Sequence, residues 1–98
     1  MLPTVRQLKV TRKQITIQNK LGLHARAAAK FVTLASQFTS DIQLARGQQQ
    51  VNGKSIMGVM MLAASIGTRL EIIAAGDDEV QACVKLEELV GQRFGEAE

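Results

Sequence analysis

Polar and apolar residues alternate in three short segments of this chain, at residues 13–18, 41–45 and 69–74. An alternation with a period of two residues is typical of strands that bury one face. Residues 46–48 contain a glycine and offer a turn, from which residues 49–51 can return as a further short strand. The pattern therefore predicts four short strands.

Two longer segments have the periodicity of amphipathic helices. One lies in residues 25–38, and the other follows the acidic residues 77–79, whose negative charge suits a helix start. The apolar face of the first helix consists of Ala28, Phe31, Ala35 and Phe38. The apolar face of the second consists of Ala82, Cys83, Leu86, Leu89 and Val90. We expect both faces to lie in the core.

Residues 56–62 are apolar nearly all round and do not alternate, which favours a short helix with Ser55 as its N-cap. A helix of this length cannot bury every side. We expect the side with Ile56, Val59 and Leu62 to face the core. Met57 and Met60 would then be exposed, as in adaptable binding surfaces, with complete burial of the segment as the alternative.

The resulting order, βαββαβα, predicts an α+β open-faced sandwich: a four-stranded, mainly antiparallel sheet with three helices on one face. The 98 residues suffice for one small domain, which we place at residues 11–94. Residues 1–10 contain the only proline and are interpreted as a flexible leader, and residues 95–98 as a tail.

Composition excludes several classes of protein. A single cysteine rules out an internal disulfide, and His24 and Cys83 are too few for a structural zinc site, so no metal and no cofactor are expected. We expect Cys83 to be a small core residue. The longest uncharged stretch, residues 55–68, is shorter than a membrane span, and no secretory signal is visible. We therefore expect a cytoplasmic protein without a membrane partner.

Charge is unevenly distributed along the chain. Residues 1–30 carry seven basic side chains and no acid, whereas residues 77–98 carry seven acids and two basic side chains. A basic half favours anionic partners, although a solvated surface of mixed sign explains it equally well. A small RNA-binding domain is one alternative. The absence of Trp and Tyr weighs against it, so we expect no nucleic-acid partner.

His24 is the strongest candidate for chemistry. It lies where a loop meets a helix that begins near Ala25, and free N–H groups at a helix start bind anions. An uncharged imidazole there can act as a nucleophile, and Arg26 adds a cation suited to phosphate oxygens. Gly22 can supply a turn. These parts suit a transient phosphohistidine, and a histidine that only caps the helix is the alternative.

Ser55 is the second candidate. A serine at a helix start is usually a cap, but the same position tolerates a phosphate because the helix end favours negative charge. The sequence alone leaves both interpretations open.

Two segments resemble a known family. Gly22-Leu23-His24-Ala25-Arg26 resembles the active-site signature of HPr, the histidine-containing phosphocarrier of the bacterial phosphotransferase system. Lys54-Ser55-Ile56-Met57-Gly58-Val59-Met60 resembles that family's regulatory serine segment. The histidine and the serine lie 31 residues apart, as in the family, and the resemblance covers about residues 11–93.

The resemblance implies a relay. His24 would take a phosphoryl group on Nδ1 from phosphorylated Enzyme I and pass it to a histidine of an enzyme IIA, so the protein would be a phosphocarrier and not a free-standing enzyme. Arg26 and the backbone amides of Ala25, Arg26 and Ala27 would bind the phosphate. Ser55 would be the target of an HPr kinase/phosphorylase where one exists. Partners would dock on Ile56, Met57 and Met60, and we expect a monomer.

One position departs from the family. Most members have proline after the arginine, where this chain has Ala27, which keeps the helix but leaves its start less rigid. Residues 19–31 look more like the nitrogen-related branch, NPr, than the sugar-transport branch, which stays the alternative. A further alternative is a regulatory binding module that acts through Ser55 without phosphotransfer, although His24 and Arg26 argue against it.

Overall fold

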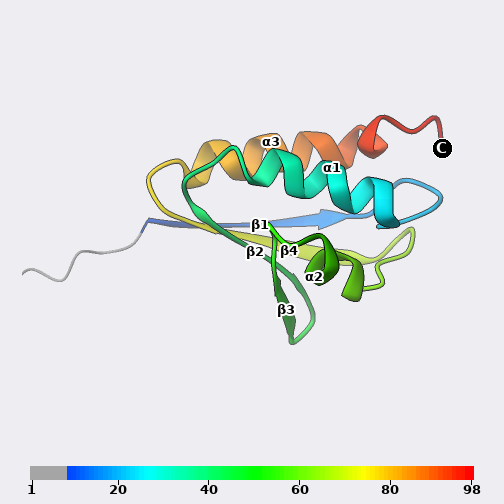
Figure 1. The fold of residues 1–98 in the computed structure, drawn as a ribbon, viewed down its shortest axis with the longest axis horizontal. Helices are drawn as coiled ribbons and strands as arrows, with labels where there is room; N and C mark the ends of the chain where they lie inside the picture. Colours follow the sequence, from blue (N-terminus) through cyan, green and yellow to red (C-terminus); the bar gives the residue numbers. More distant parts are fainter. Residues whose placement is uncertain (1–8) are drawn as a thin grey trace, which may run out of the picture.

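The computed structural model describes residues 9–98 (Figure 1). Its four strands are β1 (Val10–Thr16), β2 (Asp41–Arg46), β3 (Gln49–Asn52) and β4 (Arg69–Ala75). Its helices are α1 (Ala25–Ala35), α2 (Ile56–Met61) and α3 (Glu79–Gly91), followed by a short 3-10 turn, η1 (Arg93–Gly95). The predicted βαββαβα order is confirmed.

The strands form one sheet in the order β1-β4-β2-β3, and every neighbouring pair is antiparallel. Ile15 pairs with Leu70, and Leu44 lies between Ile72 and Val51. The strand alternation therefore places these apolar side chains on one face, while Arg12 and Gln14 lie on the other. The predicted antiparallel open-faced sandwich is confirmed.

Two of the helices, α1 and α3, lie side by side over the apolar face of the sheet (Figure 1). Phe31 of α1 and Leu86 of α3 are fully buried there, and Cys83 is buried as predicted, so that desolvation raises the pKa of its thiol. The third helix, α2, packs against α1 and contributes Val59 and the following Leu62 to the core.

Two element boundaries and the burial of one residue differ from the expectations. The first helix ends at Ala35, so that Phe38 lies beyond it and only partly covers the core. The expectation that Ile56 faces the core is wrong: it is 44% exposed, because the six-residue helix touches the core through one narrow side. The expected leader falls largely outside the described residues, but its last residue, Val10, pairs with Ala75 and begins β1.

Asp78 ties the loop after α1 to the loop before α3. Its carboxylate accepts hydrogen bonds from the backbone N–H groups of Thr39 and Ser40, both at 2.9 Å, and from the Ser40 hydroxyl. The Ser40 hydroxyl and the Thr39 amide are the main causes that lower the pKa of Asp78 to about 2. These bonds favour the ionised carboxylate and connect two loops that lie 38 residues apart.

This connection predicts an acid-sensitive component of stability. An aspartate has a pKa of about 3.9 in an unfolded chain. Because the folded value is lower, the stabilisation is present above about pH 4 and is lost as the pH falls toward 2. Urea unfolding at pH 3 and pH 6 should therefore differ less for Asp78→Asn than for the wild type. Asp77→Asn, at the exposed neighbouring position, is the control. If the stability of Asp78→Asn changes between pH 3 and pH 6 as much as that of the wild type, this account is contradicted.

Candidate functional site

The candidate site lies at the end of the sheet where β1 leads into α1. The loop turns at Gly22, whose φ is 69°, and Gly22 N–H donates to Asn19 O. The next residue, Leu23, is buried, and its N–H donates to Ala64 O at 2.9 Å. The loop before α1 is thus fixed against the segment after α2, and it presents His24 at a defined position.

His24 is the N-cap of α1, which begins at Ala25 as predicted. Its backbone is extended, with φ −72° and ψ 178°, and its ring nitrogen Nδ1 accepts the Arg26 N–H at 3.3 Å. The imidazole remains 30% exposed. The two interpretations of His24 are therefore compatible, because the side chain that caps the helix is also partly exposed.

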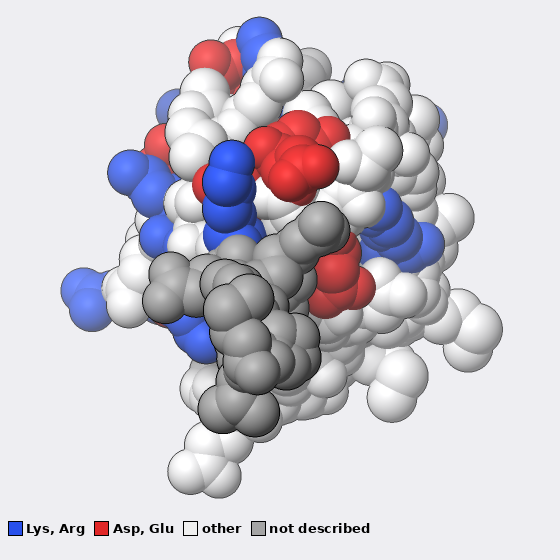
Figure 2. Space-filling view, turned by 90° about the vertical axis from the view of Figure 1, so that its left-hand side faces the viewer, with Lys and Arg blue, Asp and Glu red and all other residues white. Residues whose placement is uncertain are grey.

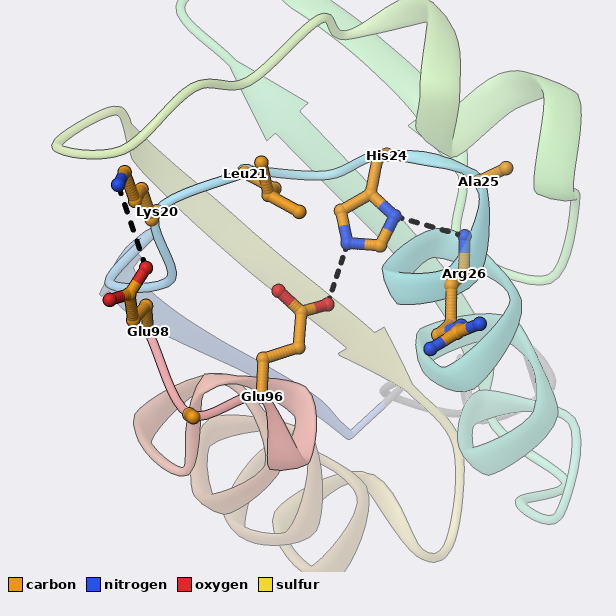
Figure 3. Close-up of a pocket in the computed structure, with 8 residues that line it drawn as sticks. Lys20, Leu21, His24, Ala25, Arg26, Glu96 and Glu98 are labelled. Atoms are coloured by element: carbon orange, nitrogen blue, oxygen red, sulfur yellow. Dashed lines mark hydrogen bonds and ion pairs between the residues drawn. The ribbon is translucent and has the colours of Figure 1, made fainter.

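The other ring nitrogen has a partner that the sequence analysis missed. His24 Nε2 lies 2.6 Å from Oε2 of Glu96 (Figure 3). Asn19 Nδ2 donates to Oε1 of the same carboxylate at 3.1 Å. Burial raises the pKa of Glu96, but the hydrogen bonds from Asn19 and His24 outweigh it and hold the pKa below its usual value. No spacing pattern in the sequence connects His24 with a residue 72 positions away.

The C-terminal segment reaches the site because α3 runs toward the end of the sheet where the loop before α1 lies (Figure 1). Arg93 and Phe94 have positive φ values of 57° and 55°, and the Phe94 side chain is buried. Lys30 of α1 donates to Phe94 O at 2.6 Å, and Lys20 N–H donates to Glu98 O. Residues 95–98, which the sequence analysis set apart as a tail, therefore contact the domain beside the loop before α1 (Figure 1).

An open pocket of about 810 Å³ is formed between this segment and the loop. Its lining residues are Lys20, Leu21, His24, Ala25, Arg26, Glu96, Ala97 and Glu98. The Arg26 guanidinium points away from the imidazole along α1, and within residues 9–98 it has no hydrogen-bond partner (Figure 3). Of the three residues expected to offer backbone amides, Ala25 and Arg26 line the pocket, whereas the Ala27 side chain is buried.

Ser55 is the N-cap of α2, as predicted, and its hydroxyl accepts the Gly58 N–H at 3.1 Å. Beyond it, apolar side chains of α2 are exposed, including Met57 at 75%. We call these residues the α2 surface: Ile56, Met57, Met60 and Met61. Because α2 packs against α1 and Ala64 O accepts the Leu23 N–H, α2 lies beside the elements that carry His24.

The uneven charge of the sequence is partly neutralised in the fold. Ion pairs join three basic residues of the first half to acidic residues of the second: Arg12–Glu71, Lys13–Glu87 and Lys20–Glu98. At the end of the molecule away from the pocket, basic and acidic groups are interspersed on the visible surface (Figure 2). The seven basic side chains of residues 1–30 are thus a poor guide to the surface charge.

Within residues 9–98, no three His, Cys, Asp or Glu side chains are grouped so that they could hold a metal ion. No helix in this part of the chain has the length and apolar character needed to cross a membrane.

Comparison with known proteins identifies the family. Residues 11–92 match the family model described as PTS HPr component phosphorylation site. The chain is 51% identical to the phosphocarrier protein HPr of Neisseria meningitidis serogroup A over 87 residues, which cover 89% of this chain and 98% of the relative. It is also 51% identical to the HPr of Cupriavidus necator over 86 residues, 88% of this chain and 97% of the relative.

Solved structures agree with these relatives. HPr-C-His from Thermoanaerobacter tengcongensis superimposes with a TM-score of 0.86 at 45% identity, covering 90% of this chain and 99% of that one. A structure described as an HPr dimer from the same organism has a TM-score of 0.71 at 49% identity, covering 84% and 94%. The fold, the family model and the relatives therefore lead to one conclusion: this chain belongs to the HPr family of phosphocarrier proteins of the phosphotransferase system.

Proposed function

We propose that this phosphocarrier accepts its phosphoryl group on Nδ1 of His24, from phosphorylated Enzyme I, and passes it to a histidine of an enzyme IIA. The observation that carries the proposal is the position of His24 as the N-cap of α1, with its ring partly exposed in an open pocket. A helix start favours the negative charge that arrives with the phosphate.

The surroundings of His24 suit a phosphate on this atom. The Arg26 N–H, which now donates to Nδ1, would donate to a phosphate oxygen once Nδ1 is bonded to phosphorus. The Arg26 guanidinium is at the rim of the pocket and can turn toward the phosphate without breaking an ion pair within residues 9–98. A guanidinium binds phosphate oxygens with two parallel hydrogen bonds, which supports a stabilising role for Arg26.

The direct test is phosphorylation by phosphoenolpyruvate and a cognate Enzyme I. We expect one acid-labile phosphate per chain, located by fragmentation on the peptide that contains His24. The HPr of Neisseria meningitidis, treated in parallel with its own Enzyme I, is the positive control. If this chain stays unmodified while the control is phosphorylated, the carrier proposal fails.

The α2 surface is the proposed docking site for both partners. We propose that the protein acts as a monomer. Ile56, Met57 and Met60 are exposed on a helix that packs against α1, the helix that His24 caps. Flexible apolar side chains adapt to different partner surfaces. Ser55 lies at the start of the same helix and is partly exposed. We further propose that an HPr kinase/phosphorylase modifies Ser55 where the host has one, placing about two negative charges beside the docking site.

Ser55→Asp tests this regulation. Aspartate is a good N-cap, so α2 should persist while a negative charge is added beside the α2 surface. We expect phosphorylation of His24 by Enzyme I to become about tenfold slower at low salt, and the difference to shrink as salt screens the charge. Ser36→Asp adds the same charge at the C-terminal end of α1, the end opposite His24, and should change the rate less than twofold. Equal rates for both variants and the wild type would contradict the proposal.

The choice of enzyme IIA also belongs to this proposal. Residues 19–31 resemble the nitrogen-related branch, so we propose a regulatory enzyme IIA as the acceptor in preference to one that serves a sugar permease. Phosphorylated protein, mixed separately with an acceptor of each class, should transfer faster to the regulatory one. Faster transfer to the sugar-transport acceptor would reverse the assignment.

A further inference from the structure

Both ring nitrogens of His24 have a partner, and one of the two must donate a hydrogen bond while the other must accept one (Figure 3). The backbone N–H of Arg26 can only donate, so Nδ1 must offer a lone pair. An ionised carboxylate can only accept, so Nε2 must carry the proton that faces Glu96. Of the two neutral tautomers of imidazole, only one satisfies both partners.

We infer that Glu96 is a positioning residue: its carboxylate holds His24 in the tautomer with the proton on Nε2 and the lone pair on Nδ1. This inference rests on the proposed function, because it assigns Glu96 a role in preparing the proposed phosphoryl acceptor. The tautomer of a histidine is set by the hydrogen bond that its second nitrogen makes. Glu96 therefore keeps the proton off the nitrogen that is proposed to attack.

Glu96 is itself held in place. Its side chain is only 17% exposed, in contrast to the Lys20–Glu98 pair, whose side chains are at least 70% exposed. Asn19, fully buried, donates from Nδ2 both to Glu96 Oε1 at 3.1 Å and to Gly22 O at 2.8 Å. The bonds from Asn19 and His24, with the nearby Lys30 charge, favour the ionised carboxylate over the opposing effect of burial.

The backbone that carries Glu96 is anchored on both sides. Phe94 is buried in the core two residues earlier, and its carbonyl accepts a hydrogen bond from Lys30. Two residues later, Glu98 O accepts the Lys20 N–H. The charged groups around the contact come from the loop before α1, from α1 and from the C-terminal segment: Lys20, Arg26, Lys30 and Glu98. The Glu96 carboxylate is thus fixed in position beside His24, unlike a mobile carboxylate on the surface.

The carboxylate also fits the product of the transfer. The Nδ1 lone pair forms a bond to phosphorus, while the bond from phosphorus to the donor's leaving atom breaks and its electron pair stays on the donor. His24 keeps its Nε2 proton, so the phosphorylated ring carries a positive charge. Glu96 Oε2 lies 2.6 Å from Nε2, so its carboxylate balances the charge without accepting the proton.

The test begins with the tautomer, which can be measured without any partner. His24 is the only histidine of the chain, so its two ring nitrogens can be observed by ¹⁵N NMR without overlap. At a pH where the ring is neutral, the wild type should show the proton on Nε2. In Glu96→Gln, one amide oxygen must serve two donors, Asn19 and His24, so we expect a mixture of both tautomers. Glu88→Gln removes the same charge from an exposed position of α3 that does not line the pocket, and it should leave the wild-type tautomer.

The second measurement is steady-state phosphorylation by Enzyme I. A positioning role predicts that Glu96→Gln lowers kcat about tenfold with KM nearly unchanged, because the loss lies in preparing the nucleophile. Glu96→Ala should behave in the same way, and Glu88→Gln should match the wild type. An unchanged tautomer in Glu96→Gln overturns the inference, as does an unchanged kcat or an effect confined to KM.

These outcomes are distinct from failure of the proposed function. If the wild type itself is not phosphorylated, His24 is not the carrier, whatever the tautomer. If the wild type is phosphorylated on His24 and the Glu96 variants keep its tautomer and kcat, only the role of Glu96 fails.

Discussion

Replacing His24 with asparagine is expected to give a stable protein that no longer accepts phosphate. Asparagine is among the best N-cap residues, so α1 should keep its start, whereas its amide cannot act as the nucleophile. Since the chain has no second histidine, no other imidazole can replace it. We expect the rate of phosphorylation by Enzyme I to fall by at least about a thousandfold.

The experiment separates chemistry from capping. His24→Ala should lose the phosphate equally and should also lose the cap, at a cost of about 1 kcal/mol or less in the free energy of unfolding. Urea unfolding measures that difference, and the acid-labile phosphate measures the chemistry. An acid-labile phosphate that persists in His24→Asn would show that another residue is the acceptor.

Gly22→Ala is expected to have the largest effect on stability among single substitutions in the loop before His24. At φ 69°, any side chain costs about 1–2 kcal/mol in backbone strain. The added Cβ would also lie 2.5 Å from Ala64 O and 3.0 Å from Ser65 Cα, which are backbone atoms that cannot move aside independently. Overpacking of this kind typically costs about 1–3 kcal/mol more.

The same substitution should impair phosphotransfer, since the loop must shift to relieve the contact and His24 shifts with it. A displacement near 1 Å at a reacting group can reduce a rate about a hundredfold. Gly47→Ala is the matched control: Gly47 has φ 59° but nothing within 4 Å of an added Cβ. It should show the backbone cost alone and a wild-type rate. If the two variants unfold at the same urea concentration, the contact with Ala64 and Ser65 contributes nothing.

Much of the fold could be predicted because the determining signals are local. Alternation located the strands, and the apolar faces of the two long helices were assigned almost completely. The errors lie where tertiary contacts decide. Ile56 has the spacing of a core residue, yet it is exposed, because Val59 is the residue that α2 buries where it packs against α1. Likewise, β1 extends to Val10 because Ala75 of β4 is there to pair with it.

Half of the candidate site could be predicted in the same way. His24 and Arg26 lie two residues apart, so their relation to the start of α1 follows from local sequence. Glu96 and Asn19 could not be found, because a glutamate near the end of a chain and an asparagine in a loop are both unremarkable in sequence. Their role appears only in the tertiary structure, where the residues after the turn at Arg93 and Phe94 contact the loop before α1.

Local sequence signals are sufficient to predict the order of elements, the apolar face of the sheet and the placement of a lone histidine at a helix start. Each of these depends on residues within a few positions of one another, where the chain geometry leaves little choice. The groups that surround that histidine and the pairing of charges depend on the tertiary structure. Those contacts join residues some 60 to 80 positions apart, which the pairing of β1 with β4 and the packing of α1 and α3 bring together.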